Sequence, residues 1–370
     1  MRIAIARIRR GNTAKSILMV GLRGVGKTVL LDQLRKDAEE AGVFSLRVEA
    51  QEGRSLPALL APHLRLALLR ISRTESAKSL AKTGLRALAG FARSLKVTYS
   101  DIEVGIDFEP LAGLADNGDL EGDLSALLEQ VGKAAKGART AVVLFIDELQ
   151  NVREAEFAAL ISALHRCAQL QLPVTVVGAG LPQLLALAGN AKSYAERLFD
   201  FPTIGPLNTA AAESAIAKPA LDRGVVFLQD AITAIVQRTH GYPYFLQEWG
   251  KHSWDVATTG PITLGDVISA STLAVAALDE SFFRVRFDRL TPMEKRYLRA
   301  MAELGEGPHR SGEIAAKLDK PTSALGPVRK SLIAKGMVWS PSYGDTSFTV
   351  PLFDEFMKRI MPGELWKTEP

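Results

Sequence analysis

The chain has 370 residues, of which 47% are hydrophobic and 23% are charged, and its formal net charge is +4. This length predicts two or three domains with a large core, and the composition is ordinary for a soluble globular protein. No run approaches roughly 18 uncharged apolar residues, residues 1–10 do not form a signal peptide, and the single Cys167 excludes an internal disulfide, so a cytoplasmic protein without a membrane segment is expected.

The earliest motif is a phosphate-binding loop. Residues 21–28 read Gly-Leu-Arg-Gly-Val-Gly-Lys-Thr and complete the pattern G-x-x-x-x-G-K-[ST]. An apolar run at 16–21 predicts a buried strand before the loop, and apolar residues at helical spacing in 29–35 predict a helix after it. In that context backbone N–H groups and the helix N-terminus point at phosphate oxygens, so the chain is expected to bind a nucleoside triphosphate.

Within this loop, Lys27 is expected to reach the β- and γ-phosphates, and the hydroxyl of Thr28 is expected to ligate Mg²⁺. The alternative is a glycine-rich turn with an incidental lysine, which the complete motif and its strand–loop–helix context argue against. The residues predicted from the loop to bind the nucleotide are Gly21, Gly24, Val25, Gly26, Lys27, Thr28 and Val29.

The segment after the first helix is longer than a compact sheet requires. A strand is predicted at 44–50, and residues 56–95 then have a helical pattern. Residues 96–108 alternate as in a small hairpin, and a turn follows at 116–119. We interpret 51–138 as an insertion, which is either a partner-binding element or a packed satellite of the main domain.

A second chemical motif is an apolar run, 141–146, that ends in Asp147 and Glu148. It predicts a strand buried on both faces of a parallel sheet, with the acids at the C-terminal edge, where ligands of open α/β sheets bind. Asp147 suits the acid that holds Mg²⁺ directly or through water, and Glu148 suits the general base that orients the attacking water. Without the phosphate loop upstream, a solvated strand end would be the simpler interpretation.

Strands alternate with helices through the first half of the chain. Further strands are predicted at 173–180 and 199–207, and a helical pattern at 157–167 precedes the first of them. The alternation predicts an α/β fold, a P-loop NTPase with a doubly wound parallel sheet. The acid pair favours the class with an extra strand between the loop strand and the acid strand. No Asn-Lys-x-Asp motif occurs, so ATP is expected rather than GTP.

The rest of the chain is mainly helical. Amphipathic helices are predicted at 209–223 and 229–239, and another follows the His-Gly-Tyr-Pro motif at 240–243. The last 80 residues then have the helix–helix–helix–hairpin order of a winged helix. Its predicted elements are helices at 291–303, 311–318 and 322–335 and a hairpin at 337–350.

The third helix of a winged helix normally enters the major groove of DNA, where Arg329, Lys330 and Lys335 would make contact. From Arg284 onward, 15 Lys and Arg stand against 11 Asp and Glu, so the whole net positive charge lies in this part of the chain. The candidate wing, however, carries Asp345 and no basic residue. An intramolecular role that reports the nucleotide state is therefore the open alternative.

The motifs also resemble a known family in their order along the chain. The phosphate loop, the acid pair, Gly-Leu-Pro-Gln at 180–183, Ala-Glu-Arg-Leu-Phe at 195–199 and Gly-Tyr-Pro at 241–243 are similar to those of initiator-type and STAND-like AAA+ ATPases. The resemblance covers nearly the whole chain. It implies a P-loop ATPase domain over 1–207, a helical lid over 208–285 and a winged-helix domain over 286–370.

The resemblance implies roles for two further residues. Arg197 would reach a phosphate, across a subunit interface or within the chain, and offset transition-state charge. Its alternative is a surface salt bridge with Glu196 or Asp200. Pro243 would pack on the adenine, and its alternative is a helix entry at which proline fixes φ.

Two features depart from that family. The strand end at 177–180 reads Val-Gly-Ala-Gly and lacks the polar side chain expected to contact the γ-phosphate, so slow hydrolysis is expected. No Gly-Arg box precedes the loop, so either the adenine pocket is abbreviated or the chain starts inside the natural domain.

Two functions remain open from the sequence. In the first, ATP or ADP with Mg²⁺ controls a winged helix in an AAA+ switch ATPase that engages double-stranded DNA. In the second, a nucleotide-gated switch for signalling or defence forms a homo-oligomer or recruits a protein partner without binding DNA. A small-molecule kinase is disfavoured because no substrate site is recognisable, and the histidines show no metal-ligand spacing.

Overall fold

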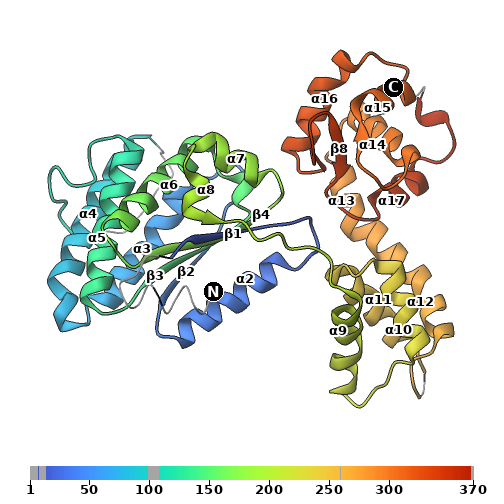
Figure 1. The fold of residues 1–370 in the computed structure, drawn as a ribbon, viewed down its shortest axis with the longest axis horizontal. Helices are drawn as coiled ribbons and strands as arrows, with labels where there is room; N and C mark the ends of the chain where they lie inside the picture. The colour runs from blue at the N-terminus through green and yellow to red at the C-terminus, as the bar shows by residue number, and fades with distance from the viewer. Residues whose placement is uncertain (1–6, 8–13, 99–107, 259, 368–370) are drawn as a thin grey trace. The chain divides into compact units, whose positions relative to one another are not determined.

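The computed structural model describes residue 7 and residues 14–98, 108–258 and 260–367. By its internal contacts the chain forms two compact units. The first unit contains the residues up to Gly21 and those from Lys27 to Thr203, and the second contains Leu22–Gly26 and the residues from Ile204 onward. Figure 1 labels the elements of both units.

A parallel sheet forms the centre of the first unit, and its strand order is β2-β3-β4-β1-β5. The strands are β1 (Ser16–Val20), β2 (Phe44–Glu49), β3 (Val142–Asp147), β4 (Val174–Gly180) and β5 (Phe199–Asp200). All neighbouring pairs run parallel, as the alternation of strands and helices predicted. β4 lies between the strand that leads into the phosphate loop and the strand that ends in the acid pair, as the acid pair predicted.

The strand at one edge of this sheet is much shorter than the one predicted at 199–207. β5 has two residues, and Thr203 adds an isolated bridge to Val20. Pro202 and Pro206 have no N–H to donate to a neighbouring strand, so a regular ladder cannot continue through them. The prediction was wrong in the length of this strand.

Helices cover both faces of the sheet. They are α2 (Lys27–Glu40), α3 (Leu56–Ile71), α4 (Lys78–Thr98), α5 (Leu120–Gly137), α6 (Glu154–Gln169), α7 (Leu184–Ala191) and α8 (Ala195–Leu198), with short 3₁₀ turns η1 (Glu75–Ala77) and η2 (Leu149–Asn151). Leucines of α3 and α5 share one buried cluster with the alternate β3 residues Val142, Leu144 and Ile146. α2 contacts β2, β3 and β4, yet its buried Leu31 and Ala38 lie outside that cluster, so α2 covers the opposite face.

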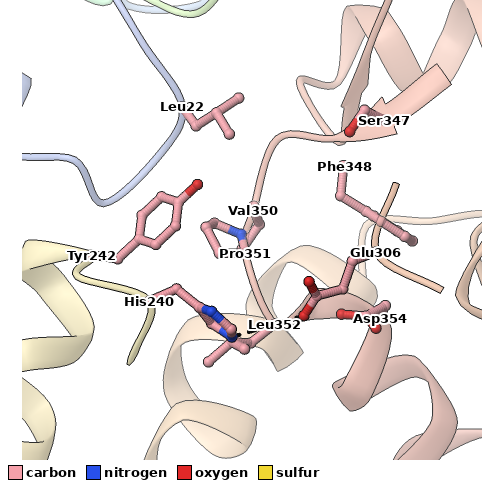
Figure 2. A pocket seen from close by; sticks show the side chains of 10 residues that line it. All are labelled: Leu22, His240, Tyr242, Glu306, Ser347, Phe348, Val350, Pro351, Leu352 and Asp354. Atoms are coloured by element: carbon pink, nitrogen blue, oxygen red, sulfur yellow. Dashed lines mark ion pairs between the residues drawn. The ribbon is translucent and has the colours of Figure 1, made fainter. Parts of the chain in front are cut away.

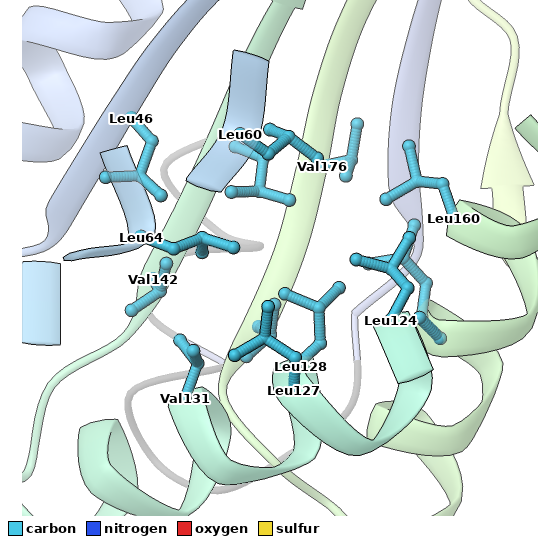
Figure 3. Close-up of a cluster of buried hydrophobic side chains, with 14 of the residues drawn as sticks. Leu46, Leu60, Leu64, Leu124, Leu127, Leu128, Val131, Val142, Leu160 and Val176 are labelled. Carbon is cyan, nitrogen blue, oxygen red and sulfur yellow. The ribbon is translucent and has the colours of Figure 1, made fainter. Parts of the chain in front are cut away.

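The helices α3, α4 and α5 occupy most of the stretch interpreted as an insertion. Their leucines belong to the same buried cluster as the strands, as Figure 3 shows for α3 and α5. The predicted hairpin at 96–108 was wrong at its start, because α4 continues to Thr98, and residues 99–107 lie outside the described part of the chain. Leu88, Phe91 and Leu95 are spaced for one buried helical face, which extends the helix.

The second unit is helical with one small sheet. Its first part contains α9 (Thr209–Leu221), α10 (Gln229–Thr239), α11 (Pro243–Val256), α12 (Leu264–Ala277), the π-helical η3 (Leu278–Phe283) and α13 (Arg284–Phe287). Its second part contains α14 (Pro292–Leu304), β6 (His309–Arg310), α15 (Ser311–Lys317), α16 (Thr322–Ala334), β7 (Val338–Trp339), β8 (Asp345–Phe348), α17 (Phe353–Ile360) and η4 (Leu365–Lys367). The helices predicted in this half are therefore present at nearly the expected bounds.

The sequence specifies several of these helix starts directly. Thr291 caps α14 in a capping box with Glu294, and Pro243 occupies the first turn of α11. The strands β6, β8 and β7 form an antiparallel sheet in that order. Phe283 contacts Phe356 with ring centroids 5.3 Å apart, so η3 and α17 share one aromatic core. Among the described residues, no helix is long and apolar enough to cross a membrane.

The core of the first unit gives a stability prediction. Leu128 in α5 is fully buried, so Leu128→Ala should lower the free energy of unfolding by about 2–5 kcal/mol through lost burial and a residual cavity. Leu66→Ala in α3, where the side chain is 50% exposed, is the matched control and should cost about 0.5 kcal/mol. Urea denaturation followed by circular dichroism measures both, and equal losses would contradict the assigned core.

Candidate functional site

The phosphate loop turns tightly at two glycines. Gly24 and Gly26 have φ of +79° and +87°, in the left-handed region that glycine adopts without strain. β1 ends at Val20 and α2 begins at Lys27, so the loop has the strand–loop–helix context that a phosphate cradle needs. The Nζ atom of Lys27 donates to the carbonyl of Gly21 at 2.9 Å, which folds the ammonium group back over the loop.

The first turn of α2 presents polar and apolar side chains to solvent. Thr28 and Val29 are exposed, whereas Val25 is buried within the loop. An exposed hydroxyl at this position is accessible to a bound cation, and the free N–H groups of a helix start suit an anion.

The acid pair begins with a buried carboxylate. Asp147 is the last residue of β3 and is 3% exposed. Its Oδ1 accepts the N–H of Glu148 at 2.9 Å, and its Oδ2 accepts from Nη2 of Arg47 at 3.2 Å. Arg47, on β2, also donates to Asp32 of α2 at 3.1 Å. The guanidinium therefore links the acid strand to the helix that follows the phosphate loop.

Sequence reasoning missed Arg47. The sequence signal was a single basic residue next to Val48, within the strand predicted at 44–50. A cation there needs a carboxylate partner, because burying an unpaired charge is costly. The β2–β3 register, which pairs Glu49 with Asp147, brings the partner alongside.

Glu148 is the first residue after β3. Its backbone is left-handed, with φ of 53°, and this turn starts η2. One of its carboxylate oxygens accepts a hydrogen bond from the side-chain amide of Gln150. The amide oxygen of Gln150 accepts from the N–H of Leu181, just beyond β4, at 2.9 Å. The sequence analysis did not single out Gln150.

The sheet brings the loop and the acids to one edge. In the parallel register Val20 pairs with Gly180, and Ile146 pairs with Gly178, so β1, β3 and β4 end side by side. The N–H of Gly21 donates to the carbonyl of Gly180 at 3.2 Å. Phosphate-binding backbone, carboxylates and the exit of β4 thus meet at the carboxyl end of the sheet, where α/β proteins bind ligands.

The oxygens available here suit Mg²⁺. This ion prefers hydroxyl, carboxylate and water oxygens and usually keeps several waters beside one or two protein ligands and substrate phosphates. Thr28 and Asp147 supply one hydroxyl and one carboxylate of that kind. The described residues contain no group of three or more His, Cys, Asp or Glu that would form a dedicated metal cage. The donor set therefore fits a magnesium ion that arrives with a nucleotide.

The tip of the phosphate loop, Leu22–Gly26, belongs by its contacts to the second unit. The N–H of Arg23 donates to the carbonyl of Thr349 at 3.2 Å, and the N–H of Tyr244 donates to the carbonyl of Gly24 at 3.2 Å. A Cβ placed on Gly26 would lie 3.9 Å from Cγ of Pro243. The start of α11 therefore lies against the tip of the loop.

A cavity of about 250 Å³ adjoins this loop tip within the second unit (Figure 2). Its lining combines apolar side chains with four titratable groups: Leu22, His240, Tyr242, Glu306, Ser347, Phe348, Val350, Pro351, Leu352 and Asp354. Nε2 of His240 lies 3.8 Å from Oε1 of Glu306. Burial raises the pKa of the Asp354 carboxyl and that of the Tyr242 hydroxyl.

Arg197 lies on α8 with an exposed side chain. Among the described residues it has no ion-pair partner, and Asp200 is instead 3.3 Å from Nζ of Lys15. The salt bridge with Glu196 or Asp200 that was its alternative is therefore not seen in the described part of the chain. The guanidinium remains accessible to a ligand or to another chain.

Two of the three basic residues predicted to contact DNA are bound internally. Arg329 donates to Thr346 Oγ1 at 2.7 Å and to the carbonyl of Asp345 at 2.7 Å. Lys335 donates to Glu294 Oε2 at 2.6 Å. Lys330 is exposed. The first two therefore stabilise the C-terminal fold, and the structure does not bring the three together as one free basic face.

A parallel sheet of this order, with a phosphate loop after β1 and an acid pair after β3, defines a P-loop NTPase-like fold. Residues 1–177 match the family profile described as "AAA ATPase domain". Residues 280–357 match a profile described as "Domain of unknown function (DUF8462)". The first half of the chain is thus similar to AAA ATPases, which suggests nucleotide binding and ATPase activity.

Solved structures of similar fold span nearly the whole chain, whereas no curated protein matches it in sequence. The Walker-type ATPase PABY2304 of Pyrococcus abyssi has a TM-score of 0.57 at 14% identity, over 92% of this chain and 90% of that one. The Aeropyrum pernix ORC1 protein in complex with DNA has a TM-score of 0.48 at 16% identity, over 96% and 90%. The Thermotoga maritima RuvB Holliday junction branch migration motor has 0.45 at 17%, over 96% and 91%. At such low identity, the likeness to PABY2304 shows a shared fold alone. The TM-scores of the other two structures are too low to support a conclusion about this chain.

The loop geometry gives a binding prediction. Lys27→Ala removes the ammonium group that lies over the loop and should weaken ATP binding by about 100-fold or more, because it deletes a charge-assisted hydrogen bond to phosphate. Lys36→Ala, on the exposed side of the same helix, is the matched control and should bind ATP as the wild type does. Isothermal titration calorimetry with ATP and Mg²⁺ measures both, and unchanged affinity in Lys27→Ala would refute the assignment of the site.

Proposed function

We propose that the chain is an ATP-binding AAA+ switch ATPase whose nucleotide state controls its C-terminal part. In this proposal 1–207 is the ATPase domain, 208–285 is a helical lid and 286–370 is a winged helix. The profile match over 1–177, the complete phosphate loop and the acid pair support the ATPase. The order α14–α15–α16–β7–β8 supports the winged helix, because three helices followed by a hairpin is the order of that fold.

The observation that carries the switch is the bonding of the loop tip. Within the second unit, the backbone of Arg23 is hydrogen-bonded to Thr349, and that of Gly24 is hydrogen-bonded to Tyr244. Thr349 is fully buried, and its own N–H donates to Met337 at 3.0 Å, so it belongs to the packed C-terminal fold. A loop that closes on phosphates moves these same backbone groups. Nucleotide binding therefore changes the contacts of the lid and the C-terminal domain.

Catalysis in this proposal uses the acid pair and the loop. Asp147 and Thr28 hold Mg²⁺, Lys27 neutralises phosphate charge, and Glu148 orients the attacking water as general base. Asp147 accepts hydrogen bonds from Arg47 and from the N–H of Glu148, which hold its carboxylate in place. No polar side chain projects from the end of β4 at 178–180, which supports slow turnover.

Two residues complete the proposed nucleotide site. Pro243 packs on the adenine, supported by its position 3.9 Å from a Cβ on Gly26. Arg197 reaches a phosphate, supported by its exposure and by the lack of an ion-pair partner among the described residues. An exposed arginine on a short helix can act within the chain or across a homo-oligomer interface.

Glu148→Gln separates binding from turnover and tests the switch. The variant should bind ATP as the wild type does but hydrolyse it at least about 100-fold more slowly, because it loses the general base. Hydrogen exchange of peptides covering 240–246 and 345–353 should then differ between the ATP-bound variant and the nucleotide-free protein. The core helix α5 serves as the internal control. Wild-type turnover by Glu148→Gln would refute the base, and identical exchange in both states would refute the switch.

Binding of double-stranded DNA is the second candidate function. It is favoured by the positive charge of the last quarter of the chain, by the exposed Lys330 and by Tyr343, which is 99% exposed in the turn between β7 and β8. The exposed Arg310 lies beside this turn, 3.1 Å from Asp345. The internal bonds of Arg329 and Lys335 weigh against it. A switch that acts through a protein partner without DNA is the alternative.

A salt titration distinguishes these functions. If the C-terminal domain binds duplex DNA, log K should fall linearly with log salt, and Lys330→Ala should reduce that slope by about 1 by removing one phosphate contact. Lys251→Ala in α11 is an exposed lysine outside the domain and should leave the slope unchanged. Fluorescence anisotropy with ATP and with ADP measures both. No binding in either state, or a flat salt dependence, would refute the DNA function.

A further inference from the structure

The proposed general base is held by a side chain that does not come from β4. Gln150 lies in η2, two residues after Glu148, and its amide nitrogen donates to Oε2 of that carboxylate. Its amide oxygen accepts from the N–H of Leu181 at 2.9 Å. One side chain therefore ties the base to the exit of the neighbouring strand.

Two glycines of β4, Gly178 and Gly180, leave space for the side chains of Leu149 and Gln150 of η2. A Cβ on Gly178 would lie 2.2 Å from Cδ1 of Leu149, and a Cβ on Gly180 would lie 2.8 Å from Oε1 of Gln150. A residue with a Cβ at either position would force the side chain of Leu149 or Gln150 to shift, because real Cβ contacts are essentially never so short. The end of β4 thus has no polar side chain of its own, and the polar side chain that lies against it is Gln150 of η2.

The same strand end contacts the phosphate loop. The carbonyl of Gly180 accepts the N–H of Gly21 at 3.2 Å, and the next residue, Leu181, donates to Gln150. The carbonyl of Gly21 in turn accepts from Nζ of Lys27 at 2.9 Å. A continuous series of hydrogen bonds therefore runs from the lysine of the loop to the carboxylate of Glu148 within the first unit.

We infer that Gln150 is a positioning residue for hydrolysis, which fixes the rotamer of Glu148 and ties it to the strand that contacts the phosphate loop. The inference rests on the proposed ATPase function. An amide donor on Oε2 leaves Oε1 of Glu148 to accept a proton from water. The left-handed backbone of Glu148 by itself does not set the direction of its side chain, so a second anchor is needed.

The decisive variant is Gln150→Ala. It should lower kcat by about 10- to 100-fold, because a misplaced catalytic group costs that much, while the Kd for ATP should change by less than about twofold. Gln150→Asn retains an amide but is one methylene too short to reach both Glu148 and Leu181, so it should recover only part of the rate. Single-turnover hydrolysis and calorimetric ATP binding separate these effects.

Gln150→Glu gives a readout that a purely structural role would not move. This variant keeps the length of the side chain but puts a carboxylate oxygen where the amide N–H donates to Oε2 of Glu148, so the two acids repel and the base is displaced. It should lower kcat at least as much as Gln150→Ala does, while the Kd for ATP changes by less than about twofold. Asn151→Ala is the matched control. Its amide lies in the same turn but donates to the carbonyl of Ala50 at 3.0 Å, so it should leave kcat unchanged.

The possible results of these experiments distinguish a failure of the inference about Gln150 from a failure of the proposed ATPase function on which it rests. An active wild type with reduced kcat in both Gln150→Ala and Gln150→Glu, at an unchanged Kd for ATP, supports the inference. An active wild type with unchanged kcat in Gln150→Ala overturns it and leaves the ATPase intact. Equal losses in Gln150→Ala and Asn151→Ala also overturn it, since they indicate damage to η2 alone. A wild type that binds ATP but never hydrolyses it refutes the ATPase itself, and the inference with it.

Discussion

β4 separates the strand that leads into the phosphate loop from the strand that ends in the acid pair, so β1 and β3 share no direct ladder. The two motifs are instead connected through the strands on either side of β3. At the carboxyl end of β4, the carbonyl of Gly180 accepts from the N–H of Gly21, and the N–H of Leu181 donates to Gln150. From the other side, Arg47 of β2 connects Asp147 to Asp32 of α2. The sheet order therefore makes the connection between the loop and the acids depend on residues of both flanking strands.

The buried position of Asp147 depends on one of these pairings. A carboxylate that is 3% exposed needs a partner, and Arg47 supplies it from the adjacent strand β2 at 3.2 Å. Because Arg47 is also bonded to Asp32, its guanidinium neutralises two acids at once. A magnesium ion beside Asp147 would add positive charge near a cation already in place. The local charge would then depend on the phosphates that arrive with the ion, which would couple metal binding to nucleotide binding.

Local patterns were sufficient to predict the loop, the acid strand and most helices. The phosphate motif, the apolar run before Asp147 and the Thr291 capping box each lie within one short stretch of sequence. The missed features all depend on pairs far apart in the chain. Gln150 and Arg47 acquire roles only through the β3–β4 and β2–β3 registers. The hairpin predicted at 96–108 was wrong at its start, because a buried helical face extends α4. The strand predicted at 199–207 was too long, because two prolines interrupt it.

The hydrogen bonds of the loop tip also limit how strong the proposed switch can be. Each backbone bond contributes about 1 kcal/mol net, so losing both the Arg23–Thr349 and the Tyr244–Gly24 bonds shifts an equilibrium by about 2 kcal/mol, or about 30-fold. That is within the usual range of couplings between two sites, about 1–3 kcal/mol. It is far below the roughly 5.5 kcal/mol needed to move a population from 1:99 to 99:1. A switch built on these two bonds alone biases the C-terminal domain, and a complete conversion needs a partner that binds one of the two states.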